Sequence, residues 1–306
     1  MDELITLSEK PTADEVYMLA GWRQWADAGN VSSMLPKYLI DHLRARKIGQ
    51  LKSDSFYLFQ LPGTQSFLRP EVKMEEGYRK SIRTHKNDLY YWGNANKGLV
   101  IFLGDEPHMG AERYADAIFN VAEELKVKRV VATGGVYAQV PYDKDRHVSC
   151  SYSMKHMKAE LDQYAVRFSN YEGGVSLGTY MADRAEYAGM EYVAFYAFVP
   201  MYDLSELSPR LEEALSVERD FKAWYDILRR INHMCALRLD LSDLQRQSNK
   251  LLQAMNRKVD DLERKQPQAG VRAFIDKLSE QFTEMSFVPL DDVWDRELGD
   301  LFDNLE

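Results

Sequence analysis

The sequence predicts an α/β protein built as a three-layer sandwich, with helices on both faces of a central sheet. Apolar runs without polar alternation recur at residues 15–21, 99–103, 129–133 and 191–199, as in strands that are buried on both faces. Between these runs, apolar residues spaced three and four apart indicate helices. Strands that alternate with helices are typical of a sheet covered by helices on both sides.

The most regular part of this pattern is the stretch 99–135. After its first apolar run, turn residues at 104–110 precede a helical stripe that begins at Ala111, and a second apolar run ends in two glycines. This order predicts a βαβ crossover with two parallel strands. Because loops at the carboxyl ends of parallel strands form the ligand crevice of α/β proteins, we expect 104–110 to line any pocket.

The N-terminal part repeats the order of strand, loop and helix. Residues 15–21 form the strand, the loop ends at Gly29, and a helical pattern begins at Asn30. Between about 53 and 96 the pattern changes to short β-rich pieces, and 86–88 has the composition of a hairpin tip. We expect an antiparallel insertion at an edge of the sheet or over the mouth of the pocket.

Strand patterns stop after Pro200. Helical stripes follow at 208–239 and 241–262, and the turn residues 266–270 precede a further stripe, which predicts a helical hairpin. Because Ser248 interrupts the apolar seam, we expect these helices to pack on the α/β part instead of forming a free coiled coil.

The sequence therefore predicts two parts. Residues 1–205 form an α/β core that carries the insertion at about 53–96, and 206–306 form a helical C-terminal extension, with a short acidic helix at 288–305. From residue 201 to the end there are 22 acidic and 15 basic residues, a difference of −7 out of the net charge of −9. The extension is thus expected to present an acidic surface.

Composition argues against several classes of protein. The chain is 45% hydrophobic and 28% charged, as in ordinary soluble globular proteins. No stretch approaches the roughly 20 apolar residues of a membrane span, and a net charge of −9 argues against nucleic acid as a partner. The amino terminus is acidic where a signal peptide would be basic, so we expect a cytoplasmic protein. The two cysteines, Cys150 and Cys235, form no CxxC pair, which argues against a disulfide scaffold or a zinc site.

The loop 21–29 has the position of a phosphate-binding loop but not its glycine spacing. Trp22 and Trp25 would also crowd a phosphate, so the sequence favours a structural turn. Asp27 has two interpretations, a contact to a ligand hydroxyl or a cap for the next helix, and capping is favoured.

The best acid–base cluster is formed by Asp105, Glu106 and His108. Proton transfer would require burial to raise the pKa of Glu106, whereas either acid would also satisfy free N–H groups at the start of the next helix. The structural interpretation is favoured. The chain contains no HExxH or GxSxG motif, so the sequence assigns no catalytic residue, no metal ligand and no cofactor.

Several motifs in order resemble the prokaryotic members of the proteasome assembly chaperone family, relatives of the second eukaryotic chaperone. The motifs are Gly21-Trp22, Asp27-Ala28-Gly29, Gly104-Asp105-Glu106-Pro107, 130–135 with Val140-Pro141, 173–178 and 198–202. The resemblance covers roughly residues 15–285. It implies a fold like that of the nucleoside phosphorylases, a helical C-terminal extension and self-association. The chain departs from the family pattern at Gln24-Trp25 and at Met201.

Two functions remain open, and so does the question whether the chain is an enzyme. The first is a protein-interaction or assembly factor without catalysis, a homo-oligomer with a possible protein client. Aromatic residues of the insertion motivate it: Phe56, Tyr57, Phe59, Phe67, Tyr90, Tyr91 and Trp92. The alternative is a binding protein or enzyme for a nucleoside or phosphate-type molecule. Its expected crevice is lined by Gly21, Trp22, Asp27, Gly29, Gly104, Glu106, Gly134, Gly135 and Pro141.

Overall fold

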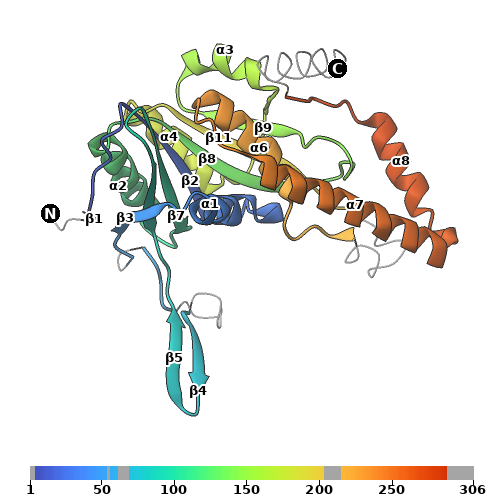
Figure 1. Ribbon diagram of the computed structural model, residues 1–306, viewed down its shortest axis with the longest axis horizontal. Coiled ribbons are helices and arrows are strands. Elements are labelled where there is room, and N and C mark those ends of the chain that lie inside the picture. Colours follow the sequence, from blue (N-terminus) through green and yellow to red (C-terminus); the bar gives the residue numbers. More distant parts are fainter. Residues whose placement is uncertain (1–3, 54–55, 61–68, 203–214, 288–306) are drawn as a thin grey trace, which may run out of the picture. The chain divides into compact units, whose positions relative to one another are not determined.

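The computed structural model describes residues 4–53, 56–60, 69–202 and 215–287 (Figure 1). The chain divides into two compact units, each made of several segments. The first unit comprises 1–136, 149–158 and 168–197, and the second comprises 137–148, 159–167 and 198–306. The proposed boundary between a core and an extension at about residue 205 stays a prediction.

The larger of the two sheets of the described residues is mixed and has nine strands. Its strands, in spatial order, are β1 (Ile5–Leu7), β3 (Arg46–Leu51), β6 (Asp88–Gly93), β7 (Lys97–Asp105), β2 (Glu15–Arg23), β8 (Val127–Ala138), β11 (Tyr192–Pro200), β9 (Val148–Tyr152) and β10 (Arg167–Phe168). Strand β2 pairs in parallel with both β7 and β8, so that Leu19 lies opposite Ile101 on one side and Val131 on the other. The predicted parallel crossover is confirmed, with β2 inserted between its two strands.

Helices cover both faces of the first unit's sheet. Met18, Ala20 and Trp22, which alternate along β2, belong to one apolar cluster with buried residues of α2 (Ala111–Glu124) and α4 (Leu177–Tyr187). On the opposite face, a Cβ atom on Gly21 would lie 2.1 Å from the carbonyl oxygen of Ser32 in α1 (Val31–His42). The prediction of a three-layer α/β sandwich is therefore confirmed, whereas the likeness to nucleoside phosphorylases stays a prediction.

The insertion contributes to two different sheets. Strand β6 pairs antiparallel with β3 and β7 in the large sheet, whereas β4 (Glu71–Glu75) and β5 (Tyr78–Arg83) form a separate hairpin, drawn in cyan in Figure 1. The predicted tip at 86–88 is wrong. The tip lies at Glu76-Gly77, where both residues have positive φ, 48° and 82°, as in the favoured two-residue hairpin turns. The piece 56–59, expected as extended, forms no strand.

The second unit contains three long helices among its described residues: α6 (Phe221–Met234), α7 (Ser242–Lys265) and α8 (Val271–Gln281). The predicted turn is confirmed, because the short helix η4 (Pro267–Ala269) and Gly270, with φ of 60°, separate α7 from α8. The expected helical segments at 208–214 and 288–305 lie outside the described residues. Short helices among the described residues include η1 (Ala28–Asn30), η2 (Lys155–Met157), α3 (Lys158–Leu161) and η3 (Asp162–Tyr164).

A buried ion pair joins two segments of the second unit that are distant in sequence. The guanidinium of Arg146, only 1% exposed, donates from Nε to Asp220 Oδ2 at 2.8 Å and from Nη1 to the carbonyl oxygens of Tyr142 and Lys144 at 2.9 Å. Asp220 in turn accepts from the backbone N–H groups of Lys222 and Ala223 and so caps α6. One carboxylate thus serves both the helix start and the loop that contains Arg146.

Helix α6 also buries charged side chains four residues apart. Lys222 Nζ contacts Asp226 Oδ1 at 2.5 Å, and Arg230 donates to the carbonyl oxygens of Asp226, Tyr164 and Ala165. Burial lowers the pKa of Arg230 to about 10, so the guanidinium stays charged at neutral pH. The backbone carbonyl groups that solvate it hold 159–167 against α6.

Replacing Asp220 with asparagine should destabilise the second unit strongly. The asparagine side chain would still accept from the first N–H groups of α6, but the Arg146 guanidinium would lose its buried counter-charge. Breaking such a pair costs about 3–5 kcal/mol of the free energy of unfolding, which urea unfolding followed by circular dichroism would measure.

The matched control is Asp276→Asn on α8, an exposed aspartate that has no ion pair among the described residues. Its effect should stay within about 0.5 kcal/mol. Equal unfolding free energies for the two variants would contradict the role given to Asp220.

Candidate functional site

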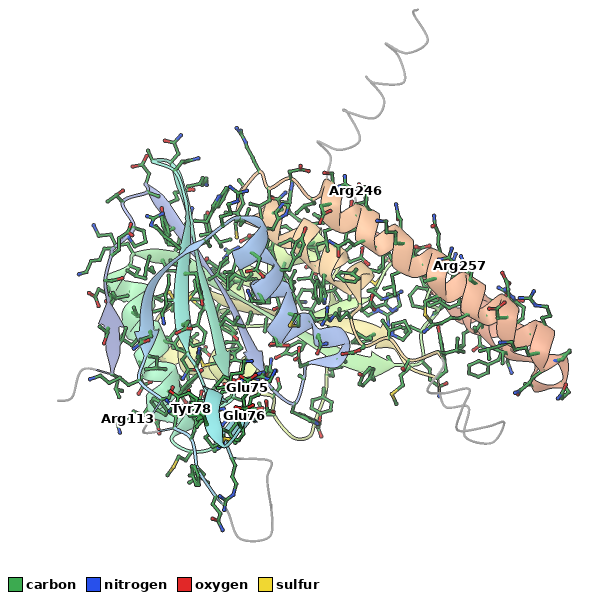
Figure 2. All side chains as sticks on the ribbon, turned by 60° about the horizontal axis from the view of Figure 1, so that its bottom comes forward. Glu75, Glu76, Tyr78, Arg113, Arg246 and Arg257 are labelled. Carbon is green, nitrogen blue, oxygen red and sulfur yellow. The ribbon has the colours of Figure 1, made fainter. Side chains whose placement is uncertain are left out.

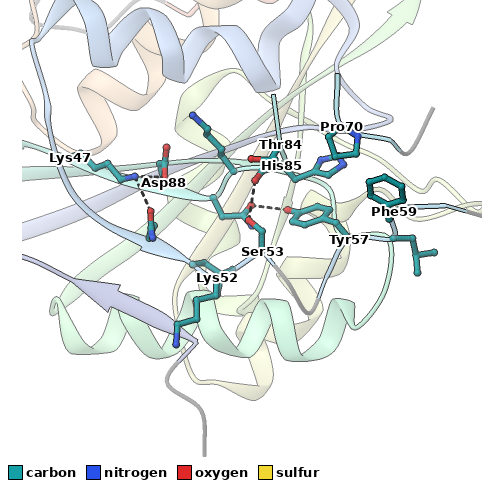
Figure 3. Close-up of a pocket in the computed structure, with 14 residues that line it drawn as sticks. Lys47, Lys52, Ser53, Tyr57, Phe59, Pro70, Thr84, His85 and Asp88 are labelled. Atoms are coloured by element: carbon teal, nitrogen blue, oxygen red, sulfur yellow. Dashed lines mark hydrogen bonds and ion pairs between the residues drawn. The ribbon is translucent and has the colours of Figure 1, made fainter. Parts of the chain in front are cut away.

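A hollow of about 840 Å³ opens in the first unit where the loops after β2 and β7 meet the root of the hairpin. Three segments line it: residues 23–33, both ends of the hairpin from Arg69 to His85, and 105–108. A second hollow, of about 590 Å³, lies beside the same root and shares Pro70, Thr84 and His85 with the first (Figure 3). The carboxyl ends of the central strands thus border a concave surface, as the topology predicts.

Strand register brings the two loops together. Arg23 and Asp105 are the last paired residues of β2 and β7. Beyond them, the N–H of Glu106 donates to the carbonyl oxygen of Arg23 at 2.9 Å, and the N–H of Trp25 donates to the Glu106 carboxylate at 3.0 Å. The Trp25 side chain is 73% exposed. The parallel pairing therefore sets the position of Glu106 directly.

Asp105 connects three chain segments. Its carboxylate is nearly buried and accepts from Arg23 Nε at 2.5 Å and from the backbone N–H of Lys86 at 3.2 Å. The second oxygen also lies 3.1 Å from His85 Nδ1. The end of β7 is thereby tied both to the end of β2 and to the segment between β5 and β6.

A buried polar chain lies behind Asp105. Trp22 Nε1 donates to the Tyr114 hydroxyl at 3.0 Å, and the hydroxyls of Tyr114 and Tyr57 both donate to Asn87 Oδ1, at 2.9 and 2.8 Å. Asn87 Nδ2 has no partner among the described residues. Burial raises the pKa of Tyr57 far above its ordinary value, so its hydroxyl keeps the proton that it donates.

Three rings pack at the root of the hairpin, and we call them the ring cluster: Tyr57, His85 and His108. Tyr57 stacks on His85 with ring centres 4.3 Å apart, and His108 meets both rings edge-on. The N–H of Leu58 donates to His108 Nδ1 at 3.1 Å, a contact that requires that nitrogen to be unprotonated. Burial, and then the neighbouring His85, lower the pKa of His108. A neutral His108 therefore fixes the start of the insertion.

A carboxylate beside imidazoles at a hollow is a typical arrangement for proton transfer. Here the contacts of Asp105, His85 and His108 each join separate chain segments, and they account for these side chains as structural ties. We therefore assign no catalytic role to them. Among the described residues, no group of three His, Cys, Asp or Glu side chains could hold a metal ion.

Of the residues expected to line the crevice, Asp27 and Glu106 border the larger hollow. Asp27 Oδ1 accepts from the N–H groups of Ser32 and Ser33 at 2.7 and 3.0 Å, so it caps α1 as the sequence favoured. Burial, opposed by these hydrogen bonds, raises the pKa of Asp27. Its carboxylate is largely occupied by this contact.

The other expected residues are packed or lie elsewhere. Trp22 is fully buried. Cβ atoms on Gly21, Gly104, Gly134 and Gly135 would come within 2.0–2.5 Å of neighbouring atoms, and Gly29 has φ of 62°. Pro141 belongs to the second unit. These glycines permit close approach of backbone, as at the Asp27–Gly135 bridge, and their role in ligand binding stays a prediction.

Sequence reasoning did not place Tyr57, His85, Asn87 and Tyr114 at this site, although it named Tyr57 among the aromatic residues of the insertion. The contacts that define them span 18 to 92 residues in sequence, such as the Asn87–Asp105 and Trp22–Tyr114 hydrogen bonds. No local periodicity encodes such pairs. One feature of the sequence could have indicated a member of this group: the polar residue Asn87 stands directly before the apolar strand β6.

Acidification should loosen the first unit through His108. Its folded pKa lies below the ordinary value of 6.5, so as pH falls through 6.5 the unfolded chain binds a proton before the folded chain does. The contribution of neutral His108 is complete above pH 6.5 and is lost below it. The free energy of unfolding, measured by urea titration between pH 7.5 and 5, should therefore fall.

His147 contributes with the same sign, because burial lowers its pKa too. The comparison of wild type with His108→Asn isolates His108, since the asparagine oxygen can still accept from Leu58 without titrating. The free energy of unfolding of the variant should fall less steeply than that of the wild type as pH falls. Equal slopes for the two proteins would contradict the role given to neutral His108.

The described residues include no helix that combines the length and the apolar character needed to cross a membrane.

No curated protein matches the chain. Several solved structures do match it. A proteasome-assembly chaperone homologue of Mycobacterium tuberculosis is 21% identical with a TM-score of 0.66, over 79% of this chain and 94% of that one.

Two further structures show the same fold. A protein of unknown function from Corynebacterium glutamicum is 17% identical with a TM-score of 0.72, over 92% of this chain and 97% of that one. PbaB, an archaeal proteasome activator from Pyrococcus furiosus, is 18% identical with a TM-score of 0.58, over 84% of this chain and 98% of that one. At these identities the likeness establishes the shared fold.

The sequence profile of the PAC2 family matches residues 22–259, more than three quarters of the 306 residues. This range includes β7, β8, β11, the hairpin, both loops at the larger hollow and most of α7, and it begins near the end of β2. It agrees with the resemblance carried by the glycine and proline motifs. The chain therefore belongs to the PAC2 family.

Proposed function

We propose that this PAC2-family protein is an assembly factor that works by binding other proteins, without catalysis. The observation that carries the proposal is the hairpin formed by β4 and β5, in which every residue is exposed. Val72, Met74 and Tyr78 are among the largest exposed apolar side chains of the described residues. Exposed apolar side chains add little to the stability of a folded chain, and a group of them on one element marks an interaction site.

The insertion supports this role through different residues from those expected. Phe56 and Tyr91 are buried in the apolar core, Phe59 is exposed, and Phe67 lies outside the described residues. Among the described residues of the insertion, four of the five large exposed apolar side chains lie in the hairpin, and one of these four is aromatic. Self-association, a protein client and a cytoplasmic location remain parts of the proposal.

The proteasome is the first client to test, because structures of similar fold include a proteasome-assembly chaperone homologue and a proteasome activator. The full-length chain would be mixed with separately purified proteasome α and β subunits of its own organism. We expect faster formation of complete particles on native gels, or a changed peptidase rate.

The same preparation, examined by light scattering, should have a mass above the 35.5 kDa of one chain. A strict monomer that changes neither particle formation nor peptidase rate would contradict the proposal. A serum albumin control at equal mass concentration separates a specific effect from simple crowding.

A small-molecule role is the second candidate, and the larger hollow favours it. The Glu106 carboxylate accepts the backbone N–H of Trp25, whose side chain is exposed, and both residues line this hollow. An exposed aromatic ring and a carboxylate at one hollow suit a molecule with a flat ring and hydroxyl groups, such as a nucleoside. Glu106 would accept from the hydroxyls.

Thermal unfolding in the presence of nucleosides, nucleotides and inorganic phosphate tests this candidate. A compound at a hundred times its Kd should raise stability by roughly 2.7 kcal/mol and hence raise Tm. Glu106→Gln should reduce the shift, whereas Glu172→Gln, at an exposed position of the same unit, should leave it intact. A constant Tm with every compound, or a shift insensitive to Glu106→Gln, would exclude this use of the hollow.

A further inference from the structure

The hairpin offers unpaired strand edges. Strands β4 and β5 pair only with each other among the described strands, and all their residues are exposed. A two-stranded hairpin alone is marginally stable in water, and its outer edges present N–H and C=O groups ready to pair with another strand. These edges are therefore available to a strand of another protein, as the proposed interaction role requires.

The register gives the hairpin one mainly apolar face, which also carries Arg79, and one polar face. Val72 lies opposite Ile82, and Met74 follows Val72 on the same face, where a bulge between Lys73 and Met74 places Met74 opposite Arg79. These three side chains are 55%, 49% and 54% exposed, in the order Val72, Ile82 and Met74. On the other face Glu71 lies opposite Arg83 and Lys73 opposite Ser81. An added strand would meet both faces.

Charge distinguishes the two edges. Strand β5 contains Arg79, Lys80 and Arg83 and no acidic residue, whereas β4 contains Glu71 and Glu75. Residues 69–86 include six basic and three acidic residues, so this segment is positive on a chain of net charge −9.

Some of these charges are already paired within the hairpin. Lys80 pairs with Glu75 at 2.8 Å and Arg83 with Glu71 at 3.5 Å. Within the described residues, Arg79 has no carboxylate within ion-pair distance. The β5 edge therefore suits an acidic strand. Figure 2 labels Glu75, Glu76 and Tyr78 near the hairpin tip.

Pairing with the same edge of a second copy is unfavourable. Two β5 strands would place arginine and lysine side chains together, and two β4 strands would place Glu71 near Glu75 of the other copy. Like charges on adjacent strands are destabilising. The charge pattern thus disfavours a symmetric pair of hairpins joined through the same edge.

We propose that the outer edge of β5 binds an extended acidic segment of a partner protein, which joins the hairpin as a third strand. Acidic side chains of that segment lie beside Arg79 and Arg83, and apolar ones lie beside Val72, Met74 and Ile82. This inference rests on the proposed protein-interaction function and names the chemistry of the partner. Main-chain hydrogen bonds would supply affinity, and the side-chain pattern would supply specificity.

The test uses the full chain and a capped six-residue peptide of alternating glutamate and valine, which matches the six residues of β5. Backbone amide NMR shifts report the site, and calorimetry reports the Kd. We expect shifts centred on 78–83, slower hydrogen exchange at the outer edge, and weaker binding as salt rises. A peptide of alternating lysine and valine should not bind.

Arg79→Glu is the diagnostic variant, because Arg79 has no ion pair within the hairpin whose loss would unfold it. Reversal of one exposed charge should raise the Kd about three- to tenfold. Arg257→Glu on α7, labelled in Figure 2, is the matched control and should leave the Kd unchanged. Cross-strand NMR contacts between Val72 and Ile82 verify that each variant keeps the hairpin.

Several outcomes would overturn this inference: no shifts at the hairpin, equal binding of the lysine peptide, or an unchanged Kd for Arg79→Glu. Concentration-dependent protection of β5 without peptide would assign the edge to a second copy and overturn it as well. If the chain is active in the proteasome experiment and the peptide experiment gives any of these results, the assembly role stands. Only the proposed binding of an acidic strand by β5 is then rejected.

Discussion

The parallel pairing of β2 with β7 and β8 is the constraint on which the first unit depends. It places Arg23 beside Asp105, and it brings Asp27 into a bridge with Gly135 just beyond the paired residues. Because three parallel strands end at one edge, their loops must share that edge. The glycines there let backbone segments approach to distances that a Cβ would forbid. The two loops that border the larger hollow are placed by this one arrangement, and the root of the hairpin completes its lining.

In both units, buried polar contacts hold together chain segments that are distant in sequence, but the groups that make these contacts differ. In the first unit, Asp105, Asn87 and the ring cluster fasten the root of the hairpin to the loop after β7. In the second unit, the Arg146–Asp220 pair and the backbone contacts of Arg230 fasten two short segments to α6. In both, a buried polar group is tolerated because hydrogen bonds replace its lost water. Such contacts specify which segments meet more than they add net stability.

Family membership and structure answer different questions about function. The PAC2 match identifies the family and the solved structures of similar fold identify the scaffold, whereas the assembly role is our proposal. The hairpin suggests how such a role is performed, since its exposed apolar face and basic strand serve no purpose in the core. The larger hollow has enough space for a small molecule. However, most of the residues first assigned to it are used for packing, which makes protein binding the stronger of the two proposals.

The sequence by itself determined the elements that depend on local pattern. Buried apolar runs predicted β2, β7, β8 and β11, a helical stripe predicted α2 from its first residue, and the turn before α8 was evident from proline and glycine. Asp27 as a helix cap was also a local inference. Only the tertiary structure decided that β2 lies between β7 and β8, that the hairpin tip lies at Glu76-Gly77, and that Asn87, Tyr57 and Tyr114 meet. Periodicity records which face of an element is apolar, whereas contacts between residues far apart in sequence depend on chain topology and leave no local trace.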